Sequence, residues 1–184
     1  MRLIENYSDR YIHKIEKFPD NLDSLYISGS KTIPKLPKNL KVLEINSCWM
    51  SELPTFPEKL ECLNINNMDI KTITNLPDGL EELDLNELHY LDKIVFPENL
   101  VQLSIRRTGI YDIPYLGKLK LLQLSKQRIY SIYLNDNTKV NVVKDVDFYG
   151  PIYVGPNFDF TKNFGGCCAP DVSELEIERI NINQ

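Results

Sequence analysis

Few side chains in this sequence combine a type and a spacing that could support catalysis. His13 and His89 could each act as a general base, but neither stands beside a matched nucleophile. The adjacent residues Cys167 and Cys168 could form a reactive thiol or a soft metal site. No further soft ligand stands near them in the sequence, so the neighbouring glycines of "NFGGCCAP" favour a loop.

A pair of carboxylates is the remaining candidate for chemistry. Asp145 and Asp147 have the spacing of residues on one face of a strand, and such a pair could act as acid and base. Exposed carboxylates more often serve only as surface groups. We therefore expect a protein without enzymatic activity, bound metal or cofactor.

The elements that position the polar residues are set by a repeated phrase. An aromatic residue or leucine followed by proline recurs after eighteen residues once and after twenty residues three times, at Phe18-Pro19, Leu36-Pro37, Phe56-Pro57, Leu76-Pro77 and Phe96-Pro97. A sixth unit begins at Leu116 without its proline. A fixed period of this length predicts stacked structural units.

Within a unit, the apolar spacing shortens from four to three to two, as in "LPDGLEELDL". Leu83 and Leu85 are two residues apart, so we expect them to point inward from a short strand, with Leu76 and Leu80 in the turn before it. Proline suits that turn because it fixes φ and is a poor strand residue. One such coil cannot bury its apolar side alone, so successive coils must stack.

The full phrase reads [LF]-P-x-x-L-x-x-L-x-[IL]-x-x-x-x-h-x-x-h, where h is apolar, and it resembles the leucine-rich repeat. The twenty-residue length is similar to the short repeats of bacterial effectors and of giant-virus and amoebal proteins. The resemblance covers about residues 12 to 132. It implies a leucine-rich repeat solenoid, a curved right-handed stack of short coils with a parallel β-sheet on the concave face and a mostly irregular or 3-10 convex side.

One position departs from the family pattern. The family usually places asparagine or cysteine three residues after the last apolar residue of the strand. Here this position holds Ser30, Cys48, Met68, Leu88, Thr108 and Gln127. We therefore expect the ladder of asparagine side chains to be largely absent, and packing to supply more of the stability.

Residues that alternate with the inward leucines should point outward from the sheet. Acidic and basic side chains are separated along the chain. Units two and four are acidic, and Arg106, Arg107 and Lys126 follow in units five and six. Solenoids use such a face to bind proteins, and the resemblance implies the same role here. The expected partner-binding residues are Tyr26, Glu44, Asn46, Asn64, Asn66, Glu82, Asp84, Asn86, Arg106 and Arg107. Trp49 lies off the strand and is predicted to be half-buried.

Three segments are expected along the chain. Residues 1–17 should form an N-terminal cap or partial repeat, residues 18–132 about six repeats, and residues 133–184 a C-terminal capping segment with a final strand. In this last segment Val172, Leu175 and Ile177 repeat the spacing of Leu80, Leu83 and Leu85.

Composition limits the function classes. The chain has 184 residues, 42% of them hydrophobic, and a formal net charge of -5, which argues against general binding to nucleic acid or to an anionic membrane. Neither a membrane span nor a secretory signal is apparent, and the four cysteines are not arranged as a disulfide scaffold. We therefore expect a cytoplasmic protein, in the host cytoplasm if it is viral or an effector.

The leading hypothesis is a non-enzymatic module that binds a protein partner, as an effector or adaptor of a pathogen or virus. The alternative is a structural or self-assembling repeat protein that forms homodimers. A cysteine-dependent enzyme is a third hypothesis.

Overall fold

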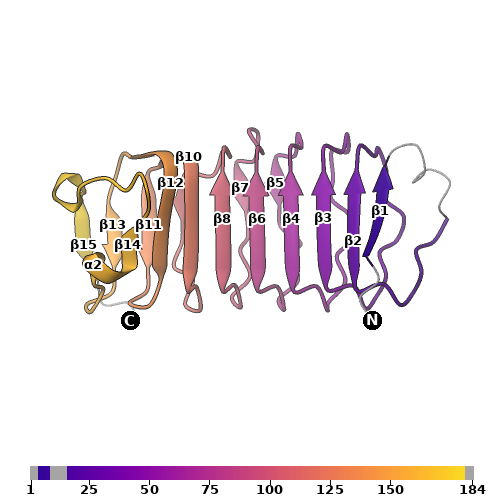
Figure 1. The fold of residues 1–184 in the computed structure, drawn as a ribbon, viewed down its shortest axis with the longest axis horizontal. Coiled ribbons are helices and arrows are strands. Elements are labelled where there is room, and N and C mark those ends of the chain that lie inside the picture. The colour runs from indigo at the N-terminus through magenta and orange to yellow at the C-terminus, as the bar shows by residue number, and fades with distance from the viewer. Residues whose placement is uncertain (1–3, 9–15, 181–184) are drawn as a thin grey trace.

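The chain folds into a parallel-strand β-solenoid of about seven stacked turns (Figure 1). The structure is a computed structural model that describes residues 4–8, as backbone only, and residues 16–180. Helix is almost absent from this described part. The predicted stack of parallel coils is therefore confirmed, whereas His13 lies outside the described residues.

One nine-stranded parallel sheet runs the length of the stack in the order β1-β2-β3-β4-β6-β8-β10-β12-β14. From β2 to β10 neighbouring strands are aligned in a constant register, so that Leu63, Leu83 and Leu103 occupy equivalent positions. The register between β10 and β12 shifts by one residue after Leu124. The strands are β1 (Ile4–Ser8), β2 (Ser24–Ser28), β3 (Val42–Asn46), β4 (Cys62–Asn66), β6 (Glu82–Asn86), β8 (Gln102–Arg106), β10 (Leu121–Ile129), β12 (Lys139–Phe148) and β14 (Phe164–Gly165).

In each coil, a backbone turn formed by the repeated proline motif precedes the strand of the large sheet. The N–H of Leu80 donates to the carbonyl of Pro77 at 3.1 Å, and the equivalent bond joins Leu40 to Pro37 at 3.2 Å. The chain then enters a strand in which Leu83 and Leu85 are buried, while Asp84 between them is only half-buried. The predicted alternation is confirmed at these positions.

A residue with left-handed backbone recurs once in each coil from β2 to β12, with φ between 47° and 65°. It directly follows the strand at Gly29, Ser47, Asn67, Glu87 and Arg107, and it lies within β10 and β12 at Lys126 and Asp145. This region is unfavourable for residues other than glycine, so the turn is held by its surroundings. For example, the N–H of Asn67 donates to the carbonyl of Asn86 in the next coil at 2.9 Å.

The next position is buried in every coil from Ser30 to Gln127, although its residue type varies. Met68 and Leu88 add packing, whereas Cys48 Sγ accepts from the N–H of Ser30 in the preceding coil at 3.4 Å. Gln127 forms several hydrogen bonds that cross to the preceding coil. Its Oε1 accepts from the N–H of Thr108 at 3.0 Å, and its Nε2 donates to the carbonyl of Ile110 at 2.5 Å. A longer amide thus links neighbouring coils at this point.

The return side of the solenoid was expected to be mostly irregular or 3-10, and it also contains short strands. Short parallel strands pair behind the large sheet in Figure 1, because isoleucines such as Ile113 and Ile132 suit strands and their backbones lie beside the next coil. They are β5 (Thr72–Ile73) with β7 (Lys93–Ile94), and the order β15-β13-β11-β9, comprising β9 (Asp112–Ile113), β11 (Ser131–Leu134), β13 (Ile152–Val154) and β15 (Ile177–Arg179).

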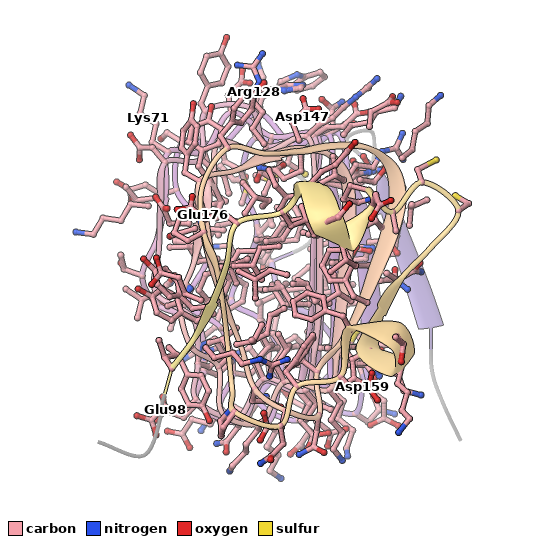
Figure 2. The ribbon with its side chains drawn as sticks, turned by 90° about the vertical axis from the view of Figure 1, so that its left-hand side faces the viewer. Lys71, Glu98, Arg128, Asp147, Asp159 and Glu176 are labelled. Atoms are coloured by element: carbon pink, nitrogen blue, oxygen red, sulfur yellow. The ribbon has the colours of Figure 1, made fainter. Side chains whose placement is uncertain are left out.

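The last described residues, up to Ile180, cross the C-terminal end of the stack, which faces the viewer in Figure 2. This segment contains α2 (Phe160–Asn163), the 3-10 helix η1 (Val172–Glu174) and β15. Phe164 is buried, and its ring lies 5.7 Å from that of Phe160. β15 pairs with β13 in the four-stranded sheet, so Ile177 is not an equivalent of Leu85.

Trp49 was predicted to be half-buried, and this is wrong because 68% of its surface is exposed. The preceding residue, Cys48, fills the buried position of this coil and is 2% exposed. The neighbouring indole therefore extends into solvent.

Candidate functional site on the outer face of the nine-stranded sheet

The outer face consists of the strand residues that alternate with the buried leucines and isoleucines. Register aligns them in three rows that run across the strands. The first row is Ser24, Val42, Cys62, Glu82, Gln102, Leu121 and Lys139. The second is Tyr26, Glu44, Asn64, Asp84, Ser104, Gln123 and Asn141. The third is Ser28, Asn46, Asn66, Asn86, Arg106, Ser125 and Lys144.

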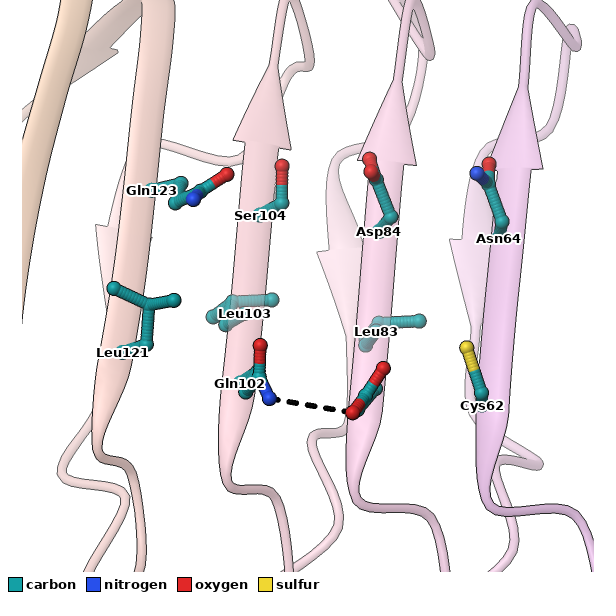
Figure 3. A pocket seen from close by; sticks show the side chains of 10 residues that line it. Cys62, Asn64, Leu83, Asp84, Gln102, Leu103, Ser104, Leu121 and Gln123 are labelled. Atoms are coloured by element: carbon teal, nitrogen blue, oxygen red, sulfur yellow. Dashed lines mark hydrogen bonds between the residues drawn. The ribbon is translucent and has the colours of Figure 1, made fainter.

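Hydrogen bonds join some neighbours within and between these rows. Asn46 Nδ2 donates to the hydroxyl of Tyr26 at 3.2 Å, and Asn86 Nδ2 donates to Asn66 Oδ1 at 3.0 Å. Gln102 Nε2 donates to Glu82 at 3.2 Å, the contact drawn in Figure 3. These bonds hold several side chains across the direction of the strands, which orders part of the face before any ligand arrives.

Two adjoining hollows open on this face. One has a volume of about 210 Å³ and is lined by residues of β4, β6, β8 and β10 that include Asn64, Glu82 and Asp84 (Figure 3). The other has a volume of about 230 Å³ and reaches Arg106 and Ser125. Asp84 lines both. Both volumes are below the range usual for small-molecule sites, so each hollow suits a single side chain of a ligand.

Three polar atoms of the outer face are buried without a hydrogen-bond partner in the described part of the chain. They are Asn64 Oδ1, Asn86 Oδ1 and Arg106 Nε. Asn64 is aligned with Asp84 on the neighbouring strand β4, and Asn86 is the next outward residue after Asp84 on β6. Arg106 lies on the next strand, β8. A buried polar atom without a partner costs free energy, so these atoms are places where a bound ligand would gain affinity.

Burial and negative charge act together around the first hollow. Burial raises the pKa of the Cys62 thiol to about 11, and the carboxylates of Glu82, Asp84 and Glu44 add to this rise. Burial also raises the pKa of Asp84, while the hydrogen bond from Ser104 and the charge of Arg106 lower it. This region therefore disfavours further negative charge and favours an incoming cation.

The structure brings nine of the ten predicted partner-binding residues onto one continuous face. Arg107 is the exception, because it occupies the left-handed position after β8 and forms an ion pair with Glu87 at 2.8 Å. Gln102, Ser104 and Gln123 line the hollows but were not selected from the sequence. The same alternation places them outward, so it could have found them.

The candidates for catalysis do not converge. His89 is exposed, as are Asp145 and Asp147. The sulfurs of the exposed Cys167 and Cys168 lie 3.7 Å apart, and the Cys167 thiol donates to the carbonyl of Val143 at 2.7 Å. Among the residues that the structure describes, no group of three histidine, cysteine or acidic side chains could hold a metal ion.

Comparison of the chain with protein-family models, with curated proteins and with solved structures finds no match. The described residues also contain no helix that is long and apolar enough to cross a membrane. The assignment of a function therefore depends on the geometry of the outer face.

Proposed function

We propose that this protein is a non-enzymatic binding module and that its outer face binds a protein partner. In this proposal the coils are leucine-rich repeats of about twenty residues, and the outer face is their concave surface. The observation that carries the proposal is the alignment of three polar rows around two hollows, with buried hydrogen-bonding atoms that no described residue satisfies.

The character of the face favours a protein over a small molecule. The rows extend over seven strands, whereas the hollows are shallow and each is lined by residues from neighbouring strands. An extended surface of this kind suits the concave binding mode of solenoids. Tyr26 and Arg106 belong to the residue types that contribute most to protein interfaces.

The proposal places the protein in the cytoplasm. Cys167 and Cys168 are free thiols, and both are exposed with their sulfurs 3.7 Å apart. Exposed neighbouring thiols persist in a reducing compartment, which supports an intracellular location.

A pull-down from a lysate of the source cells tests the proposed face. The bait would be the wild-type chain, the variants Arg106→Glu and Tyr26→Ala, and the control Lys93→Glu on the return side, with quantification by mass spectrometry. We expect proteins that the wild-type and control baits enrich and that both outer-face variants lose. Enrichment that survives both outer-face changes would show that binding occurs elsewhere.

Self-association is the second candidate, and a column of tyrosines favours it. The rings of Tyr111, Tyr130 and Tyr149 follow one another with centroids 5.2 Å and 5.7 Å apart, and between 39% and 61% of each residue is exposed. A second copy could cover this column. Size-exclusion chromatography with light scattering would then give a dimer for the wild type and a monomer for Tyr130→Ser.

A further inference from the structure

The charges of the outer face are divided between its two halves. The carboxylates of Glu44, Glu82 and Asp84 lie on β3 and β6, and Arg106 lies on β8. Lys139 and Lys144 on β12 are aligned with the outer-face residues Leu121 and Ser125 of β10. The N-terminal half of the described outer face is therefore acidic and its C-terminal half basic.

Hydrogen-bonding atoms without partners follow the same division. Asn64 Oδ1 and Asn86 Oδ1, which can only accept, lie on β4 and β6 in the acidic half. Arg106 Nε, which can only donate, lies in the basic half. Among the described residues, two acceptors in the acidic half therefore lack a donor, and one donor in the basic half lacks an acceptor. This observation is independent of the charges and specifies the same kind of ligand.

The two hollows differ in the same direction, although they share Asp84. The lining of the first includes Glu82 and Asn64 and no basic residue, whereas the second is lined by Arg106 together with Asp84 and Asn86. The second is displaced by one strand across the sheet and by one outward residue along it. These steps of about 4.8 Å and about 6.6 Å give a separation of about 8 Å. Outward residues i and i+2 of an extended chain are about 7 Å apart, so they match this distance.

Building on the proposed function, we infer that the partner presents an extended segment in which a lysine or arginine stands two positions from an aspartate or glutamate, in one fixed order. The basic side chain enters the first hollow and donates to Asp84, Glu82 and Asn64 Oδ1. The acidic side chain enters the second hollow and accepts from Arg106. The order of the two charges fixes the direction in which the segment crosses the sheet.

A library of random twelve-residue peptides displayed on phage provides the probe. It would be selected in parallel on the wild-type chain, on the double variant Asp84→Lys with Arg106→Glu, and on the control Lys93→Glu with Glu98→Lys, which inverts two exposed charges away from the outer face. Circular dichroism and thermal unfolding would establish that all three are folded. The milder pair Asp84→Asn with Arg106→Gln serves if the double reversal does not fold.

We expect the wild type and the control to select peptides with the basic residue two positions before, or two positions after, the acidic one, in one consistent order. The double reversal should select the opposite order. Wild-type peptides should bind it about 10- to 100-fold more weakly in fluorescence polarisation, because two charge pairs become repulsive. The neutral pair should lose the charge preference.

Two results would overturn the inference and can be told apart. Peptides that bind the outer face, as shown by loss of binding to either variant, but without a charge order would refute the dipolar segment and leave the proposed function standing. Peptides that bind the double reversal as tightly as the wild type would count against both the inference and the proposed face.

Discussion

Replacing Leu83 with alanine should destabilise the solenoid far more than changing its exposed neighbour on the same strand. Leu83 is 2% exposed and stands in register between Leu63 and Leu103, both in the core. The removed carbon atoms lose about 2.4 kcal/mol of transfer free energy at about 0.8 kcal/mol for each carbon. A residual cavity adds to this, because the coils on both sides cannot close the gap.

The expected loss in the free energy of unfolding is about 3 to 4 kcal/mol, within the range of about 2 to 5 kcal/mol for buried leucines. For a chain of this length this corresponds to a decrease of about 6 to 16 °C in Tm. Glu82→Ala is the matched control, because Glu82 is exposed, and it should change stability by about 0.5 kcal/mol or less.

Urea unfolding followed by far-UV circular dichroism measures both variants, with calorimetry as a test of cooperativity, since solenoids can unfold in parts. Equal destabilisation by Leu83→Ala and Glu82→Ala would refute the assignment of inward and outward residues. The same would follow if Glu82→Ala proved the more damaging change.

Three further expectations concern single side chains. Gln127→Leu should cost about 2 to 4 kcal/mol, since it leaves the Thr108 N–H and the Ile110 carbonyl without their partner, and Gln123→Leu on the outer face should cost much less in the same urea assay. For Asp84, the raised pKa means that ionisation opposes folding, so wild-type stability should fall as pH rises from below 3.8 through the folded pKa. Asp84→Asn should therefore gain stability relative to wild type between about pH 3 and neutral pH, and a relative loss over this interval would contradict the burial of Asp84. Cys62, with a pKa of about 11, should contain about 100-fold less thiolate at pH 8 than a thiol with the ordinary value of 9.0, so iodoacetamide should label it slowly, and rapid labelling seen by peptide mass spectrometry would exclude this environment.

Much of the architecture could be predicted because the sequence repeats the same local physics in each unit. The spacing of Leu80, Leu83 and Leu85 encodes a turn followed by alternation in a strand, and the stack follows since one coil cannot bury these residues alone. The outer-face residues follow from the same alternation. A period of twenty residues also fixes which of them become neighbours on adjacent strands.

Other features depend on contacts that no local pattern contains. The return strands require that the backbones of adjacent coils lie within hydrogen-bonding distance. One example is the backbone N–H of Tyr130, which donates to the Tyr111 carbonyl at 2.8 Å. The role of Gln127 depends on the reach of its amide across to Thr108 and Ile110. The hollows depend on side-chain lengths over four strands, so the alternation places Ser104 and Gln123 on the outer face without showing that they line a hollow.

The exposure of Trp49 shows a different limit. Its coil could place either Cys48 or Trp49 against the core, and only the geometry after the left-handed Ser47 decides between them. Where the backbone leaves a strand, the apolar character of a residue does not predict whether its side chain is buried. A shift of one residue there exchanges the buried and the exposed positions.

Photo-crosslinking from the outer face tests the central claim most directly. A benzoylphenylalanine placed at Ser104, between the two hollows, would be compared in source cells with one at the exposed Thr72 of β5 on the return side. We predict a discrete crosslinked protein from position 104 that is absent from position 72 and that disappears when Arg106→Glu is added. Crosslinks of equal yield from both positions, or from position 72 alone, would contradict binding at the outer face.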